Sequence, residues 1–171
     1  MTKPLLICAA LSLAALLAGC PGPGAPAPGP SAMPPAPVDA ADDMIVQTPP
    51  HAASWDGDAT PDGLDVQLYF FVYRAQPPVT VQGRVEFLLY EGILQPADLP
   101  KQPPAYTWVF TGDLLRSRQA RSTVGWGYAM QLGWGKNPPQ TSSVTLLVKY
   151  TPNQGAPIIF SKPITIAVGP R

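Results

Sequence analysis

Cysteine and histidine are nearly absent from this 171-residue chain, which has two cysteines, Cys8 and Cys20, and one histidine, His51. Because both cysteines lie in the first 20 residues, the rest of the chain has no thiol for a disulfide, a cysteine metal site or a cysteine nucleophile. One histidine excludes a zinc site built from several histidines, and a Ser-His-Asp triad would have to use it. His51 lies in a proline-rich stretch that predicts a surface loop, and the chain has no G-x-S-x-G motif. We therefore expect a protein without enzymatic activity.

Charged residues are also few, at 13%, and 11 basic residues balance 11 acidic ones. A chain close to neutral has no bulk electrostatic attraction for nucleic acid, so we expect no nucleic-acid partner. Three arginines, Arg116, Arg118 and Arg121, lie close together. Such a group can bind phosphate, but it is more typical of a solvated face.

Among the features that are present, the first is an apolar run from Leu5 to Leu17, preceded by Lys3. The run is too short to span a bilayer with ease, and its charge pattern is that of a signal peptide. It ends in Leu17-Ala18-Gly19-Cys20, which resembles the lipobox of bacterial lipoproteins. The resemblance implies a signal peptide over residues 1–19 and acyl chains on Cys20 as the first mature residue. More than one acyl chain gives stable anchoring, so we expect the membrane as a partner through this lipid.

The residue after Cys20 bears on the destination of the protein. In lipoproteins of bacteria with two membranes, an aspartate at this position usually signals retention in the inner membrane. The residue here is Pro21. We therefore expect a lipid-anchored protein on the exported side of the bacterial cell envelope, in the outer membrane rather than the inner one.

Proline is abundant, with 24 residues, and many of them follow Cys20. Residues 21–37 contain only proline, glycine, alanine, serine and methionine, so this stretch has little to bury. Proline-rich segments favour the extended polyproline II conformation and act as semi-rigid spacers. We expect the lipidated cysteine and a disordered linker to occupy residues 20–43.

The rest of the chain, residues 44–171, is predicted to form one domain built from β-strands. Apolar residues alternate with polar ones in most of its segments, and glycine- or proline-containing turns separate them. We expect an all-β fold, a two-layer antiparallel β-sandwich similar in size to an immunoglobulin domain, with about six or seven strands. The expected strands cover residues 44–48, 64–73, 79–90, 105–111, 122–134, 143–150 and 157–168. Pro163 predicts an edge strand or a bulge in the last one, and Asp113 could cap a short helical turn.

The strand at 122–134 has two unequal faces. Its even residues are large and apolar, whereas its odd residues include Gly125, Gly127 and Gly133. Glycine inside a strand often marks a close approach by another group. We expect aromatic side chains from a neighbouring strand to fill the space above these glycines.

One acidic segment is a candidate metal site. Asp56, Asp58 and Asp62 alternate with other residues, which resembles the opening of a calcium-binding loop. Pro61 and Gln67 depart from the EF-hand pattern, and the alternative is a solvated loop stabilised by Asx turns. We expect no cofactor, with calcium at these three carboxylates as the alternative.

The tryptophans are candidates for ligand binding. Trp108, Trp126 and Trp134 could form a platform that stacks sugar rings, although large aromatic residues in a domain without disulfides are more often core. Trp126 and Trp134 share the apolar face of their strand, which favours the core. We therefore expect a structural or interaction module whose partner is an envelope protein or a glycan. The alternative is a carbohydrate-binding module on the cell surface.

Overall fold

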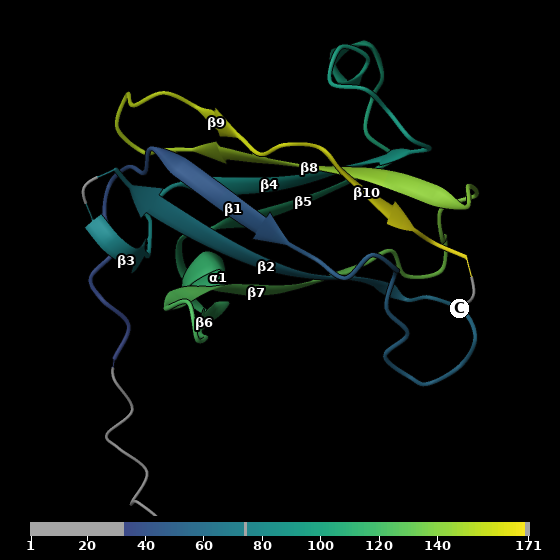
Figure 1. Ribbon diagram of the computed structural model, residues 1–171, viewed down its shortest axis with the longest axis horizontal. Helices are drawn as coiled ribbons and strands as arrows, with labels where there is room; N and C mark the ends of the chain where they lie inside the picture. Colours follow the sequence, from purple (N-terminus) through teal and green to yellow (C-terminus); the bar gives the residue numbers. More distant parts are fainter. Residues whose placement is uncertain (1–32, 74, 170–171) are drawn as a thin grey trace, which may run out of the picture. The chain divides into compact units, whose positions relative to one another are not determined.

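The computed structural model describes residues 33–73 and 75–169, and in this part the chain forms two antiparallel five-stranded sheets packed face to face (Figure 1). This confirms the predicted all-β sandwich. The first sheet has the order β1-β2-β7-β6, and the second has the order β10-β8-β4-β5. The strands of the first sheet are β1 (Asp43–Gln47), β2 (Gly63–Val72), β7 (Trp126–Gly133) and β6 (Gln119–Arg121), with β3 (Ala75–Val79) also paired to β2. Those of the second are β10 (Ile164–Ala167), β8 (Ser143–Thr151), β4 (Arg84–Glu91) and β5 (Tyr106–Thr111), with β9 (Ile159–Phe160) also paired to β8.

The core lies between the sheets and follows the period of two in the sequence. Alternate residues of β2, β4, β7 and β8 point inward and are almost inaccessible to solvent. They are Leu64, Val66, Leu68, Phe70, Val85, Phe87, Leu89, Tyr128, Met130, Leu132, Val144, Leu146, Val148 and Tyr150. The predicted apolar faces of the segments 64–73 and 143–150 are thereby confirmed.

The strand predicted over 79–90 begins later, because β4 starts at Arg84. Val79 instead ends β3, whose other residues lie outside the expected strands and which belongs to the other sheet. β3 pairs with β2, whereas β4 pairs with β5 and β8. The chain crosses between the layers at residues 80–83, where Gly83 has a φ of 125° that favours glycine. A Cβ there would also lie 2.5 Å from the backbone oxygen of Thr151. Alternation continued through the crossover, so the sequence pattern did not reveal it.

The described residues form ten strands where about six or seven were expected. Two of the additional strands, β3 and β6, lie in segments that were expected to be connections, and the predicted strand over 157–168 divides into β9 and β10. Pro163 separates β9 from β10, as a residue without an N–H should. Both pieces pair with β8, so the edge strand is interrupted but keeps its partner. The predicted helical turn is α1 (Gly112–Arg116), and Asp113 lies inside its first turn, since Thr111 is the N-cap residue.

The sandwich begins earlier than the expected boundary at residue 44. The compact unit starts at Pro34, and Val38 bridges Val81 through backbone hydrogen bonds of 2.8 and 2.9 Å. Ala41 is buried in the main core. Residues 34–43 therefore pack on the sandwich, although we had expected them in the linker. The expected signal peptide, Cys20 and the linker up to residue 32 lie outside the described residues.

The two outer faces of the sandwich differ. The loop 92–104, which contains a short 3-10 turn (Leu99–Lys101), stands above the second sheet in Figure 1. Its Leu99 packs with Tyr90 and Leu147 in a small separate apolar cluster. The outer face of the first sheet instead carries an open polar groove. No helix in the described part of the chain is long and apolar enough to cross a bilayer.

Candidate functional site

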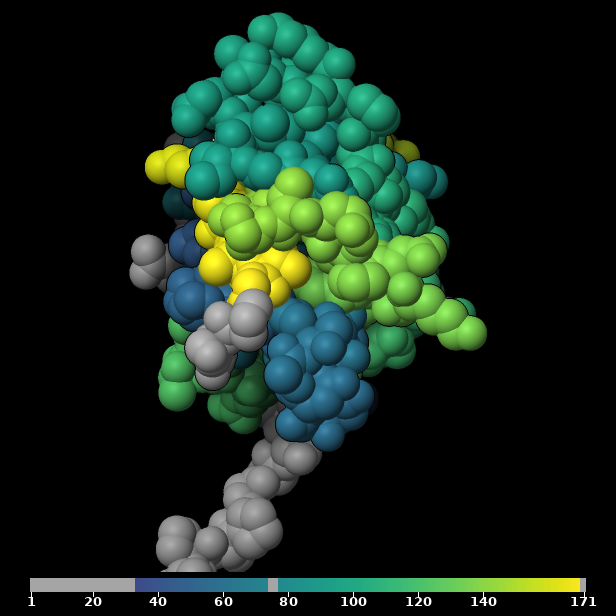
Figure 2. Space-filling model, turned by 90° about the vertical axis from the view of Figure 1, so that its right-hand side faces the viewer, coloured from purple at the N-terminus to yellow at the C-terminus, as the bar shows by residue number. Residues whose placement is uncertain are grey.

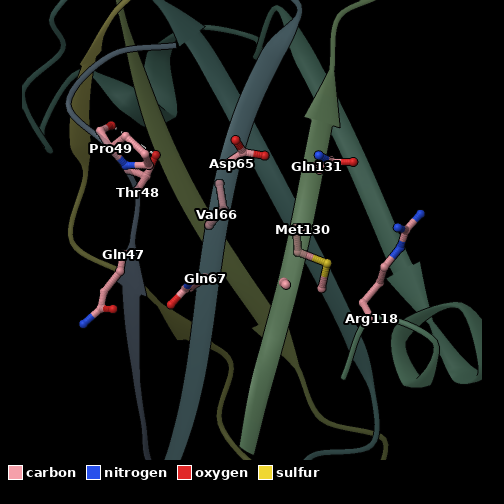
Figure 3. A pocket seen from close by; sticks show the side chains of 10 residues that line it. Gln47, Thr48, Pro49, Asp65, Val66, Gln67, Arg118, Met130 and Gln131 are labelled. Carbon is pink, nitrogen blue, oxygen red and sulfur yellow. Dashed lines mark hydrogen bonds between the residues drawn. The ribbon is translucent and has the colours of Figure 1, made fainter. Parts of the chain in front are cut away.

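The groove lies on the outer face of β1, β2 and β7 and has a volume of ≈ 620 Å³ (Figure 3). Strand register explains how its residues come together. Gln47 on β1 lies opposite Gln67 on β2, and Gln67 lies opposite Ala129 on β7. The Ala129 N–H donates to the Arg118 carbonyl (2.9 Å), which extends the same row to a fourth segment. The lining residues are Gln47, Thr48, Pro49, Asp65, Val66, Gln67, Arg118, Ala129, Met130 and Gln131.

The adjacent row on the same face adds a carboxylate and a further amide. Asp65 on β2 lies directly opposite Gln131 on β7. Side chains two residues apart on a strand share a face, so Asp65 and Gln67 point to the same side, as do Ala129 and Gln131. Ala129 is the smallest of these residues, and its size leaves the groove between the polar side chains that surround it.

Trp55 borders the groove at one end. Its indole ring lies against Gly63 and Gly133, which are opposite each other in the row next to Asp65 and Gln131. The Trp55 N–H donates to Asp62 Oδ2 (2.6 Å), and the indole Nε1–H donates to Asp65 Oδ1 (3.2 Å). Despite these contacts Trp55 keeps 41% of its surface exposed. It is therefore an aromatic ring in a fixed orientation beside a polar groove.

Tyr69 occupies the other end of the same face. A Cβ on Gly127 would lie 2.6 Å from its ring, and the phenol is buried. This confirms that an aromatic side chain of a neighbouring strand fills the space above a glycine of β7. The Tyr69 hydroxyl donates to Gln67 Oε1 (2.8 Å). This bond orients the Gln67 amide, whose NH₂ group can donate to a ligand and whose oxygen keeps a second lone pair to accept from one.

The segment 54–62 folds at the end of the sandwich next to the last strand, and Figure 2 shows it in blue beside the yellow C-terminal segment. Its carboxylates accept local hydrogen bonds, as Asx turns do. Asp56 Oδ1 accepts from Asp58 N (3.0 Å), Asp58 Oδ1 accepts from Thr60 N (2.6 Å), and Asp62 binds Trp55. The described residues contain no group of three or more acidic, histidine or cysteine side chains that could hold a metal. The structure thus gives the calcium alternative for Asp56, Asp58 and Asp62 no support.

The three tryptophans proposed as a sugar platform do not form one. Trp134 is buried, and its Nε1–H donates to the Pro61 carbonyl (2.8 Å). Trp108 is half-buried between the sheets, where its Nε1–H donates to the Gly133 carbonyl (3.0 Å). Trp126 was expected in the core, but it is half-buried at the start of β7 and is not among the residues that pack against the main core. β7 begins at Trp126, so this side chain lies at the end of the strand rather than in its centre.

A second hollow of ≈ 400 Å³ contains Arg84 and Arg116. Arg84 pairs with Glu86 (3.0 Å), and Arg116 pairs with Asp113. The hydrogen bond from Arg84 is the largest effect that lowers the pKa of the Glu86 carboxyl. Because both guanidinium groups have carboxylate partners, the hollow does not favour an anionic ligand.

His51 is exposed and bridges Ala167 through its backbone, as expected of a surface residue.

The side chains that line the groove offer nearly equal numbers of hydrogen-bond donors and hydrogen-bond acceptors. Its three glutamines carry a donor and an acceptor each, Asp65 adds an acceptor, and Arg118 adds donors. The sequence does not reveal that Gln47, Gln67 and Gln131 share a face, because only strand register brings them together. It does not reveal Trp55 either, whose ring reaches this face from a loop. The chain matches no protein-family model, and comparisons with curated proteins and with solved structures gave no significant match.

Proposed function

We propose that this chain is a lipid-anchored lipoprotein of the bacterial envelope that presents a non-enzymatic β-sandwich binding module. The observation that carries the proposal is the order of its parts. The tetrapeptide Leu17-Ala18-Gly19-Cys20 is followed by a proline-rich segment and then by a sandwich whose compact unit begins at Pro34. In this arrangement Cys20 anchors the protein, and the proline-rich segment separates the sandwich from the bilayer. Pro21 in place of aspartate favours the outer membrane.

The binding surface of the module is the groove on the first sheet. It holds amides, one carboxylate and one guanidinium, which are groups that recognise a ligand by hydrogen bonds. Asp65 already accepts the Trp55 indole N–H, and His51 does not line the groove. A nucleophile paired with a general base is the usual requirement for covalent catalysis, and the lining residues do not supply that pair.

Lipidation is tested by growing a strain that carries the gene with an alkyne-labelled fatty acid. The wild-type protein should incorporate the label and fractionate with membranes. A Cys20→Ser variant should incorporate none and leave the membrane fraction. Mature wild-type protein that begins at another residue without lipid would refute the anchor.

Binding is tested with the purified mature chain carrying Cys20→Ser, so that lipid does not contribute. This protein should sediment with isolated cell envelopes. Ala129→Arg places a long side chain at an exposed position in the groove and should abolish sedimentation. Thr107→Arg makes the same change of charge at an exposed position of β5 on the other sheet and should have no effect. Equal sedimentation of the two variants would show that the groove is not the binding surface.

A further inference from the structure

We infer that the ligand of this groove is a glycan, an uncharged chain of hydroxyl-rich sugar units that crosses the glutamine row and stacks on Trp55. The inference rests on the proposed binding function and specifies its ligand. Three features of the groove support it: the balance of its hydrogen-bonding groups, the fixed aromatic ring, and its position over interior strands.

The polar groups match sugar hydroxyls. Each hydroxyl both donates and accepts a hydrogen bond, and each glutamine amide does the same. Asp65 and Arg118 contribute one charge of each sign, so the groove has no net charge that would select an ionic ligand. An apolar peptide or an acyl chain would leave these polar groups desolvated without partners, which is unfavourable.

Trp55 supplies the surface on which a sugar ring can stack. Two backbone glycines, a bond from its N–H to Asp62 and a bond from its indole to Asp65 hold the ring in place. Its exposed fraction of 41% leaves part of the ring available. Because the ring is ordered before the ligand arrives, binding does not have to immobilise it. A fixed aromatic beside hydrogen-bonding side chains is the arrangement that a ring with one polar edge and one C–H face requires.

The position of the groove argues against a peptide added as a strand. Strand addition needs the free N–H and C=O groups of a sheet edge. Most of the groove lies over β2 and β7, and both are interior strands, because β2 pairs with β1 and β7, and β7 pairs with β2 and β6. Their backbone groups are already used in the sheet. Recognition here must therefore come from side chains, as it does for sugars.

The test uses the purified mature chain with Cys20→Ser and two named probes, cellohexaose and chitohexaose, in isothermal titration calorimetry. The first probe represents hexose chains, and the second represents N-acetylated chains such as those of cell walls. We expect one of them to bind. Trp55→Ala should lower that affinity about tenfold through the loss of stacking. Gln131→Ala should lower it about fivefold through the loss of a hydrogen bond.

Ala129→Arg should abolish binding of the oligosaccharide, and Thr107→Arg should not change it. Thermal melts of all variants show which of them remain folded, and Gln131→Ala, at an exposed strand position, keeps the test valid if Trp55→Ala unfolds. The glycan inference fails if neither probe binds, or if the bound probe is indifferent to all three groove variants. If neither probe binds but protease treatment of the envelopes abolishes sedimentation that depends on Ala129, the ligand is a protein and the proposed binding function stands.

Discussion

At the residue scale, the groove depends on a pair of glycines that lie opposite each other. Glycine is unfavourable inside a strand, since it loses much backbone freedom on folding and offers no side chain to pack. Gly63 and Gly133 allow the Trp55 ring to lie directly on the sheet. The cost in strand stability is offset by burial of part of the indole, and the ring gains a fixed orientation next to Asp65.

The two glycines should respond differently to alanine. A Cβ on Gly63 would lie 2.4 Å from the backbone oxygen of Leu132, and backbone within a sheet cannot easily move. A Cβ on Gly133 would lie 3.3 Å from the Trp55 ring and 3.8 Å from the Asp62 carbonyl oxygen, an ordinary contact distance. We expect Gly63→Ala to lower the free energy of unfolding by about 1–3 kcal/mol, as overpacking does, and Gly133→Ala to lower it by less than about 1 kcal/mol. Urea unfolding of both variants measures the difference, and equal losses would contradict this account of the ring.

Two buried tyrosines form hydrogen bonds with the backbone of the segment that crosses between the sheets. The Tyr128 hydroxyl accepts from Val81 N (2.8 Å), and the Tyr150 hydroxyl donates to the Gln82 carbonyl. Tyr128→Phe would leave the buried Val81 N–H without this partner, which costs about 1–3 kcal/mol. Tyr73→Phe is the control, because Tyr73 is 85% exposed and should lose nothing measurable. Chemical denaturation compares the stabilities of the two variants. A Tyr128→Phe protein as stable as the control would show that the hydrogen bond between Tyr128 and Val81 does not stabilise the domain.

Burial of Tyr150 also predicts how stability depends on pH. Desolvation is the largest cause that raises the pKa of its phenol from 10.0 to about 12, and the neighbouring Tyr128 and Asp39 add to it. The unfolded chain therefore loses this proton at lower pH than the folded chain does. The contribution of Tyr150 is complete below pH 10 and is lost as the pH rises toward 12. The denaturation midpoint should therefore decrease between pH 10 and pH 12. In Tyr150→Phe the midpoint should decrease less over the same range. An equal decrease in the variant would exclude Tyr150 as the cause.

At the element scale, the loop 92–104 is attached to the second sheet by one buried hydroxyl. Thr145 is fully buried on β8, and its Oγ1 accepts from Leu94 N (2.9 Å) and donates to the Gly92 carbonyl (2.8 Å). Together with the apolar contacts of Leu99, these bonds explain why a proline-rich loop keeps a defined position. The loop packs on the second sheet through Leu99, whereas the groove lies on the first sheet.

Thr145→Val should release this attachment. Valine has nearly the same shape but leaves the Leu94 N–H and the Gly92 carbonyl unpaired, which costs about 1–3 kcal/mol. Thr165, opposite Thr145 on β10, is exposed, and Thr165→Val is the matched control. Hydrogen exchange at Leu94 should accelerate in Thr145→Val alone. If exchange there is unchanged, the loop is held by Leu99 and not by the hydroxyl.

Most of the strands, and the faces that they bury, could be predicted from the sequence. Alternation identified the longer strands and their inward faces, because burial of one face requires a period of two, but it did not identify the short strands β3 and β6. It did not identify the crossover at Gly83, since alternation continues on both sides of it, nor the division at Pro163 into two pieces with one partner. The site was predicted less well. The alternative of a sugar platform at Trp108, Trp126 and Trp134 finds no support, because Trp134 is buried and the other two are half-buried. The expectation that Trp126 lies in the core was wrong, because facing direction alone does not tell how deeply a residue at the end of a strand is buried.

The groove itself could not be predicted from periodicity. Gln47, Gln67 and Gln131 lie on three strands that are far apart in the sequence, and only their register brings them together. Trp55 directly precedes the acidic segment, and only its contacts with Gly63 and Gly133 place its ring on this face of the sheet. The one sequence signal that pointed to the site was the set of glycines in the predicted strand. Gly127 and Gly133 do lie under aromatic rings, those of Tyr69 and Trp55, whereas Gly125 lies against Pro77 and Pro78.

At the scale of the whole molecule, the segment before β1 is part of the folded domain. Val38 bridges Val81 at the crossover, Ala41 is buried in the core, and the Asp39 carbonyl oxygen lies 3.3 Å from the Tyr150 hydroxyl. These contacts place the start of the folded domain at about residue 34. The proline-rich stretch that serves as spacer in the proposed function is therefore shorter than the composition suggested.

Two deletions in the mature Cys20→Ser chain test this boundary. Removal of residues 21–33 should leave the unfolding midpoint unchanged, because the compact unit begins at Pro34. Removal of residues 21–43 exposes the core contacts of Val38 and Ala41, breaks the bridge to Val81, and should destabilise the domain by at least about 2 kcal/mol. Thermal melts followed by circular dichroism compare the two proteins. Equal midpoints would mean that residues 34–43 only rest on the sandwich and belong to the spacer, and a loss with the shorter deletion would mean that the spacer itself packs on the domain.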